Sequence, residues 1–189
     1  MTTNETRAVV IGASAGAVQA LLKILPALPA EFPAPVLVAV HVPADRDNVL
    51  APLLQSRCRV RVKEAEDKEP AAAGVVYFAP SDYHLLVERD GSLALSSDEL
   101  VNYSRPSIDV LFESAADAYG AGLTGVILTG ANTDGAAGLQ AVATAGGETI
   151  VEDPRQAYAS TMPEAALAAC PARVLDLDAI ADHLARMPG

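Results

Sequence analysis

The sequence predicts an α/β fold with a doubly wound, mainly parallel sheet, flanked by helices and carrying a small β-hairpin. Short β-branched runs alternate with Ala- and Leu-rich segments of helical period, which is typical of βαβ units. The run from Val36 to Val40 is continuously apolar, as expected of a strand that is covered on both faces. We therefore expect a buried parallel sheet between two layers of helices.

The expected strands are the short apolar runs Ala8 to Ile11, Val36 to Val40, Val60 to Lys63, Val75 to Phe78, Val126 to Leu128 and Thr149 to Val151. The hairpin is expected where two further runs, Leu85 to Glu88 and Leu93 to Leu95, flank the turn dipeptide Asp90-Gly91. The expected helices are Gly16 to Leu25, Asn48 to Gln55, Ser107 to Tyr119, Ala136 to Ala145, Met162 to Ala169 and Asp178 to Met187. Their ends are indicated by Pro26, by Ser107 as an N-cap and by Gly146-Gly147.

Length and charge narrow the class of protein. A chain of 189 residues suits one domain. The net charge of −11 argues against binding to nucleic acid or to anionic membranes, which requires clustered Lys and Arg. No apolar run approaches the roughly 20 residues that span a bilayer, and the polar start, Met1 to Arg7, does not resemble a signal peptide. We expect a cytoplasmic protein in which Cys58 and Cys170 are buried free thiols.

Three reactive side chains follow predicted strands. Ser14 comes after the first strand, His41 after Val36 to Val40, and Asp134 after Val126 to Leu128. In an open α/β sheet, ligands bind beyond the carboxyl ends of the strands, so these side chains can converge. A serine activated by a histidine, which an aspartate orients, is the triad of serine hydrolases.

Ser14 lies in Gly12-Ala13-Ser14-Ala15-Gly16, which matches the G-x-S-x-G pattern of nucleophile turns between a strand and a helix. The free N–H groups at the start of the following helix can stabilise an oxyanion. A serine that only caps the helix fits the same pentapeptide equally well. A dinucleotide site is a weaker interpretation, because G-x-G-x-x-G requires glycine where Ser14 stands.

The other two positions also have structural interpretations. His41 could be a loop histidine without catalytic function. Its place at a strand end nevertheless favours a role as general base, for which His84 and His183 are poorer candidates. Asp134 precedes a helix, where aspartate is a common N-cap. Other aspartates compete for the role of triad acid: Asp45, Asp47, Asp82 and Asp109.

Seven segments occur in an order that resembles one known family: GASAGAVQAL, VHVP, VKEAEDKE, YFAPSDYH, RPSIDVLF, GVILTGANTDGAAGL and the MPEAA segment. This order resembles the catalytic domain of the bacterial chemotaxis protein-glutamate methylesterases, the CheB family. The resemblance runs from about Ala8 to about Ala169 and implies one catalytic domain over residues 1–189, with its core at about 8–170. It implies a doubly wound domain whose triad is Ser14, His41 and Asp134.

The resemblance also implies the reaction, which is hydrolysis of glutamyl methyl esters on the cytoplasmic helices of methyl-accepting chemoreceptors. Many members of the family also deamidate receptor glutamines. No metal or organic cofactor is required. A deamidase with the same triad and a catalytically silent module of a signalling complex remain the alternatives.

The sequence departs from the family pattern near the predicted site. Ala15 replaces a threonine, Ala17 replaces a glycine, and Gly130-Ala131-Asn132 replaces a Gly-Met-Gly-type turn. We expect the backbone N–H groups near Ala15 and Ala131 to stabilise the oxyanion. Arg105 is a candidate to orient acidic substrate, although a surface residue before a helix cap is the better interpretation of the same position. Family members commonly carry an N-terminal receiver domain, for which this chain has no room before Ala8. We expect that phosphorylation in cis does not control this chain. We expect it to be either constitutively active or controlled by a separate partner.

Overall fold

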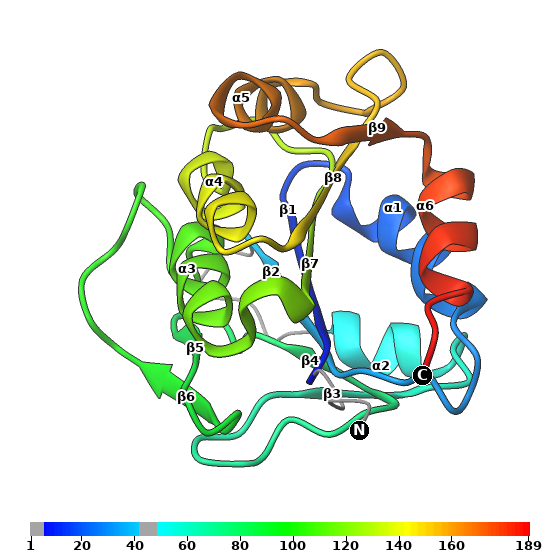
Figure 1. Cartoon of the computed structure of the whole chain (residues 1–189), viewed down its shortest axis with the longest axis vertical. Coiled ribbons are helices and arrows are strands. Elements are labelled where there is room, and N and C mark those ends of the chain that lie inside the picture. The colour runs from blue at the N-terminus through cyan, green and yellow to red at the C-terminus, as the bar shows by residue number, and fades with distance from the viewer. Residues whose placement is uncertain (1–5, 42–48) are drawn as a thin grey trace.

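The computed structural model describes residues 6–41 and 49–189, which form the expected helix–sheet–helix layers (Figure 1). Within these residues one parallel sheet has the strand order β3-β4-β2-β1-β7-β8-β9. Its strands are β1 (Ala8–Ala13), β2 (Val36–Val40), β3 (Arg61–Glu64), β4 (Val75–Phe78), β7 (Leu123–Ile127), β8 (Glu148–Glu152) and β9 (Arg173–Leu175). The predicted hairpin is confirmed as the antiparallel pair β5 (His84–Val87) and β6 (Leu93–Ser96).

Helices cover both faces of the sheet, as Figure 1 shows. One layer contains α1 (Ala17–Ile24), α2 (Leu50–Gln55) and α6 (Leu177–Ala185), and the other contains α3 (Ile108–Tyr119), α4 (Ala136–Thr144) and α5 (Thr161–Ala169). Successive side chains of a strand point to opposite faces, so β1 contributes to two hydrophobic cores. Val9 and Ile11 belong to the core under α1 and α6, whereas Val10 belongs to the core under α3 and α4.

Besides small shifts at the ends of several elements, three details differ from the sequence prediction. The edge strand β9 was not expected, because it has three residues, of which Arg173 and Val174 are exposed, and so presents no apolar run. The first helix ends at Ile24, and Pro26 lies in a 3-10 helix, η1 (Leu25–Ala27), whose first turn tolerates proline. The helix expected from Asn48 begins at Leu50 as α2, while Asn48 itself lies outside the described residues.

Both cysteines are free, as expected. Cys170 is buried, but Cys58 is only partly buried. Burial raises the pKa of the Cys58 thiol to about 11, which disfavours the reactive thiolate at neutral pH.

The order of the strands creates a crevice at the carboxyl ends of β1 and β7. These strands are neighbours at the centre of the sheet. The chain leaves β1 into α1 on one face and leaves β7 into α4 on the other. Connections that diverge in this way leave room for a ligand between them. The residues that follow β1, β2 and β7 therefore border one site.

Candidate active site

Ser14 lies in a tight turn between the end of β1 and the start of α1. Its N–H donates to the carbonyl of Thr129 (2.9 Å), and its carbonyl accepts from the N–H of Ala17 (2.9 Å). Gly16 has a φ of 86°, a left-handed conformation that glycine adopts without strain. A Cβ at Gly16 would also lie 2.7 Å from Cβ of Tyr158. The G-x-S-x-G segment therefore makes the sharp strand-to-helix turn that the sequence predicts.

His41 follows β2 directly beside Ser14. The parallel strands β1 and β2 pair Ala13 with Val40, so Ser14 and His41 are the next residues of the two strands. The N–H of His41 donates to the carbonyl of Ala13 (3.3 Å), which extends the ladder by one bond. The imidazole Nε2 lies 2.7 Å from Oδ2 of Asp134. The sheet register thus places His41 next to Ser14 along the sheet, and the imidazole contacts a carboxylate.

Asp134 is a buried carboxylate on which five donors converge. Oδ2 accepts from Nε2 of His41 and from the N–H of Ile108, both at 2.7 Å. Oδ1 accepts from Nδ2 of Asn102 (2.8 Å), Oγ of Ser107 (3.0 Å) and the N–H of Asp109 (3.1 Å). Burial opposes ionisation, but hydrogen bonds led by the one from His41 outweigh it, so the pKa of Asp134 lies below its usual value. At neutral pH Asp134 is therefore an anion that orients the imidazole.

The N-termini of α3 and α4 each bind a carboxylate from the start of the other helix. Asp134 precedes α4 and accepts from the first N–H groups of α3. Asp109, in the first turn of α3, accepts from the N–H groups of Gly135 (3.0 Å) and Gly138 (2.7 Å) at the start of α4. Negative charge at a helix N-terminus is stabilising. Burial, with the charge of Asp134, nevertheless raises the pKa of Asp109. The exchange fixes the two helices, and with them the carboxylate that faces His41.

Asn102 joins these two carboxylates, and sequence reasoning did not identify it. Its Nδ2 lies 2.7 Å from Oδ2 of Asp109 and 2.8 Å from Oδ1 of Asp134. Asn102 has a φ of 52° and the next residue, Tyr103, a φ of 62°, a conformation that asparagine tolerates better than most residues. Its partner Asp134 is 32 residues away. No local pattern in the sequence indicates such a contact.

Ser107 occupies the predicted N-cap position of α3, but another side chain performs the capping. Its hydroxyl makes no capping bond to the helix and donates to Oδ1 of Asp134 instead. The N–H of Ser107 donates to Nδ1 of His84 (3.1 Å), and Nε2 of His84 contacts the carbonyl of Glu99 (2.8 Å). His84 is thus held between backbone groups in a buried position.

Of the other aspartates that compete in the sequence for the role of triad acid, the structure describes two. Asp82 pairs with Arg105, and Asp109 lies behind Asp134 as described. Asp45 and Asp47 lie outside the described residues. Of the candidates that the structure describes, Asp134 is the carboxylate in contact with His41.

Thr129, at the end of the β7 segment, braces the turn of Ser14. Its Oγ1 donates to the carbonyl of Ala15 (2.8 Å) and accepts from the N–H of Ala159 (2.9 Å). Its N–H donates to Oε2 of Glu152 (2.8 Å) at the end of β8. Glu152 is a buried carboxylate whose pKa is raised by burial. The turn of Ser14 is thus connected to two neighbouring strand ends.

Two backbone N–H groups lie open near the serine. Within residues 6–41 and 49–189, the N–H groups of Ala15 and Ala131 have no hydrogen-bond partner, and neither has the hydroxyl of Ser14. These are the two groups that the sequence predicts for the oxyanion hole. They are available to a substrate oxygen.

Asn132 connects the turn of Asp134 to the far side of the imidazole. Its Nδ2 lies 3.0 Å from Nδ1 of His41, and its Oδ1 accepts from the N–H of Asp134 (3.0 Å). Sequence reasoning marked Asn132 only as a departure from the family pattern. Its partner His41 is 91 residues away, so no local signal points to the contact.

A hollow of about 610 Å³ opens beside the serine turn, lined by Ala15, Gly16, Gln19 and Tyr158. The side chain of Tyr158 is 82% exposed. An aromatic ring and an amide therefore flank one approach to Ser14, and both can contact a bound polypeptide.

Arg105, which the sequence offers as a candidate to orient substrate, is bound to groups of its own chain. Its Nη2 and Nε lie 2.7 and 3.1 Å from Oδ1 of Asp82. Its Nη1 donates to the carbonyls of Ser97 (3.0 Å) and Asp98 (2.9 Å). These contacts anchor the segment that leads to Asn102.

Replacing Arg105 with alanine tests which role it has. If it acts by anchoring Asn102, the Arg105→Ala variant loses kcat/KM by the same factor, about 3- to 10-fold, on a small ester and on a protein substrate. We expect this result, with Arg61→Ala on the exposed face of β3 as the unaffected control. If instead only the KM for the protein substrate rises, Arg105 contributes to substrate binding.

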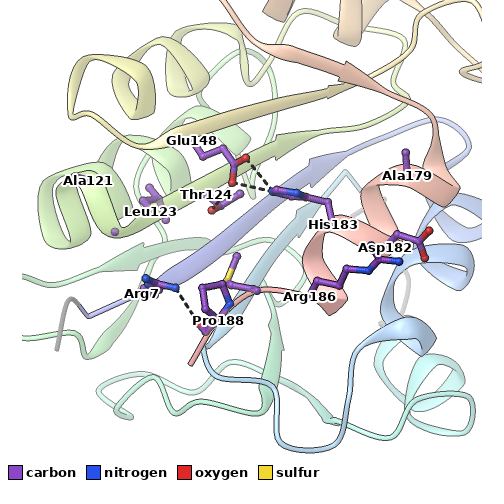
Figure 2. A pocket seen from close by; sticks show the side chains of 12 residues that line it. Arg7, Ala121, Leu123, Thr124, Glu148, Ala179, Asp182, His183, Arg186 and Pro188 are labelled. Atoms are coloured by element: carbon purple, nitrogen blue, oxygen red, sulfur yellow. Dashed lines mark hydrogen bonds and ion pairs between the residues drawn. The ribbon is translucent and has the colours of Figure 1, made fainter. Parts of the chain in front are cut away.

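Figure 2 shows a second hollow, of about 550 Å³, at the amino ends of β1, β7 and β8. It lies at the edge of the sheet opposite to Ser14. Glu148 and His183 line it, and Oε1 of Glu148 lies 2.9 Å from Nε2 of His183 on α6. The same oxygen lies 3.0 Å from Nη1 of Arg173, which does not line the hollow. Burial opposes ionisation of Glu148, but His183 and Arg173 outweigh it, so the pKa of Glu148 lies below its usual value.

The depressed pKa of Glu148 predicts how stability depends on pH. The ionised carboxylate stabilises the fold above its unfolded pKa, and this contribution is lost as pH falls through the lower folded pKa. We expect Glu148→Gln to lower the free energy of unfolding by about 1 kcal/mol or less near neutral pH, because the pair is partly exposed. The difference should begin to shrink near the unfolded pKa of about 4.3 and vanish only once the pH lies below the lowered folded pKa. Urea denaturation at neutral pH and across this acid range checks this, and a difference that does not shrink in acid would contradict it.

Neither a metal cluster nor a membrane helix is found in the described ranges. No three His, Cys, Asp or Glu side chains of residues 6–41 and 49–189 are grouped so as to hold a metal ion. In the same residues no helix is long and apolar enough to cross a bilayer.

A serine, a histidine and a buried aspartate thus lie at three strand ends of a parallel sheet, and the histidine contacts the aspartate. These are the residue types of the serine hydrolase triad. The sequence profile of the CheB methylesterases matches residues 9–184. The chain therefore belongs to the CheB methylesterase family, as the sequence resemblance implied.

Individual proteins and structures agree with this membership. A Leptospira interrogans protein is 46% identical over 181 residues, which cover 95% of this chain and 94% of the relative. The protein-glutamate methylesterase/protein-glutamine glutaminase of Symbiobacterium thermophilum is 41% identical over 97% of this chain, which spans about half of that relative (51%). The crystal structure of the Thermotoga maritima CheB methylesterase catalytic domain is 37% identical, with a TM-score of 0.90 over 94% of this chain and 96% of that one.

Proposed function

We propose that this chain hydrolyses glutamyl methyl esters on methyl-accepting chemoreceptors, with Ser14 as nucleophile, His41 as general base and Asp134 as the group that orients the base. The observation that carries the proposal is the 2.7 Å contact between His41 and Asp134 at the strand end beside Ser14. The family membership and the names of relatives support the choice of substrate.

The contact with Asp134 supports Nδ1 as the nitrogen of His41 that acts as base. The ionised carboxylate only accepts hydrogen bonds, so Nε2 carries a proton toward it and Nδ1 keeps a lone pair. Nδ1 takes the proton of Ser14 Oγ as the oxygen attacks the ester carbonyl. Asp134 stabilises the imidazolium that forms.

The rest of the reaction follows from the same groups. The N–H groups of Ala15 and Ala131 stabilise the negative oxygen of the tetrahedral intermediate. When the intermediate collapses, the C–O bond to methoxide breaks and the imidazolium donates its proton, so methanol leaves. Water, deprotonated by His41, then attacks the glutamyl-Ser14 ester and releases free glutamate side chain and serine. Since the backbone supplies both oxyanion donors, Ala131 serves in place of methionine.

Deamidation of receptor glutamine is a second candidate activity. It uses the same acyl-enzyme and differs only in that ammonia leaves instead of methanol. The names of relatives from several organisms include protein-glutamine glutaminase, which favours retention of both reactions. The third candidate is a silent module of a signalling complex, which would not need an ordered contact between His41 and Asp134.

The surroundings of the enzyme are part of the proposal. The residues that the structure describes act as one catalytic domain, because two continuous cores cover the two faces of a single sheet. We place it in the cytoplasm, where the methylated helices of chemoreceptors lie.

Matched receptor fragments test the proposal. Two fragments carry either the glutamyl methyl ester or glutamine at the same position, and methanol and ammonia are quantified. We expect methanol from the first fragment and slower release of ammonia from the second. Ammonia without methanol would make the chain a deamidase, and neither product would favour the silent module or another methylated target.

A further inference from the structure

The lone pair that His41 needs for catalysis is occupied by Asn132. Nε2 of His41 donates to Asp134, so Nδ1 is the free acceptor of the ring. Nδ2 of Asn132 lies 3.0 Å from this Nδ1. In the same structure the hydroxyl of Ser14 has no hydrogen-bond partner among the described residues. The amide of Asn132 therefore stands where the proton of Ser14 would go.

The orientation of the Asn132 amide is fixed by the backbone. Its Oδ1 accepts from the N–H of Asp134 (3.0 Å). An N–H group needs an acceptor, so the oxygen of the amide must face Asp134 and the NH₂ group must face His41. Two hydrogen bonds thus hold the same side chain, one in the turn and one on the base.

We propose that Asn132 is a positioning residue that restrains the general base: its amide competes with Ser14 for Nδ1 of His41 and must leave for the proton transfer to occur. The inference rests on the proposed serine hydrolase function. Among the described residues the ionisable group that contacts the imidazole is Asp134, with Asp109 behind it. The charge around the ring stays the same when Asn132 leaves, so the restraint is a matter of hydrogen bonding alone.

Three substitutions at Asn132 separate this role from support of the turn. Asn132→Ala and Asn132→Gly remove both hydrogen bonds, and glycine is the residue that the family pattern has at this position. Asn132→Asp keeps the oxygen that accepts from Asp134 but replaces the donor to His41 by a carboxylate. That carboxylate favours a protonated Nδ1, so it blocks the base at neutral pH.

The experiment measures the rate at which a fluorophosphonate labels Ser14, a reaction in which the Ser14 oxygen bonds to phosphorus, fluoride leaves and His41 takes the proton. At neutral pH we expect the Ala and Gly variants to label about 2- to 10-fold faster than the native chain. We expect Asn132→Asp to label at least about 10-fold slower and to recover at alkaline pH, with its pH–rate profile displaced upward. Thr133→Ala, an exposed position in the same turn, is the matched control and should label at the native rate.

If Asn132 only supports the turn, the labelling rates of the variants should follow the opposite order. Asn132→Asp, which keeps the turn, would then label at nearly the native rate, and Asn132→Ala more slowly. If the Ala and Gly variants, folded by circular dichroism, label no faster than the native chain, the proposal is overturned. If one variant fails to fold, the other decides. A native chain that does not label at all would overturn the proposed function, and this inference with it.

Discussion

Replacing Ser14 with alanine is expected to lower ester hydrolysis by about 10⁴- to 10⁶-fold, because members of a triad act as a unit and the covalent step then has no nucleophile. The stability of the fold should not change. The hydroxyl of Ser14 has no partner within the described residues, and the backbone bonds to Thr129 and Ala17 remain in the variant. Steady-state release of methanol and labelling by a fluorophosphonate measure the loss.

The control for Ser14→Ala is the same substitution at a serine outside the proposed site. Ser56→Ala removes a hydroxyl that bonds to the carbonyl of Leu53 (2.6 Å) at the end of α2, and it should keep full activity. Residual hydrolysis in Ser14→Ala within about tenfold of the native rate would mean that another group attacks the ester.

Replacing Asp134 with asparagine is expected to have the second largest effect, and it acts on both rate and stability. An amide presents NH₂ to some of the five donors that Asp134 now satisfies, so donors at the start of α3 lose their acceptor. We expect the free energy of unfolding to fall by about 3 kcal/mol. The amide also allows the wrong tautomer of His41, for which we expect a loss of about 10⁴-fold in kcat.

Asp109→Asn is the matched control, because Asp109 is a buried carboxylate at a helix N-terminus in the same cluster but does not contact His41. Because the pKa of Asp109 is raised, its ionised form contributes less to the stability of the fold. The Asp109→Asn variant should therefore be less destabilised than Asp134→Asn. Equal losses of activity in the two variants would show that Asp134 only supports the fold.

The depressed pKa of Asp134 adds a pH dependence. Its ionised form stabilises the fold above the unfolded pKa, about 3.9, and this contribution is lost as pH falls through the lower folded value. The difference in the free energy of unfolding between the native chain and Asp134→Asn should have its full size near neutral pH and should shrink in acid. Urea denaturation across this range measures it.

Much of the fold and the core of the site were predictable because they depend on short-range patterns. Continuous apolar runs locate the central strands, and the order of β1, β2 and β7 in a doubly wound sheet brings the residues after them together. Ser14 and His41 become neighbours simply because Ala13 pairs with Val40. The short edge strand β9 escaped prediction because its exposed residues form no apolar run.

The parts of the site that the sequence did not indicate depend on contacts between distant loops. Asn102 binds two carboxylates from a left-handed turn, and Asn132 binds the imidazole, yet neither lies in a pattern that specifies its partner. Asp134 fits a helix cap and a triad acid equally well in sequence. In the structure it contacts His41 and also accepts from the first N–H groups of α3, rather than from the helix it precedes.

Peptide mass spectrometry of a methylated chemoreceptor, before and after incubation with the native chain, tests whether receptor glutamyl methyl esters are the substrate. We expect the methylated glutamates to lose their methyl groups, the same peptides to stay methylated with Ser14→Ala, and the acyl-enzyme to form at Ser14. Methylated peptides that persist with the native chain, although the fluorophosphonate labels Ser14, would contradict the proposed substrate and leave a serine hydrolase with a different target.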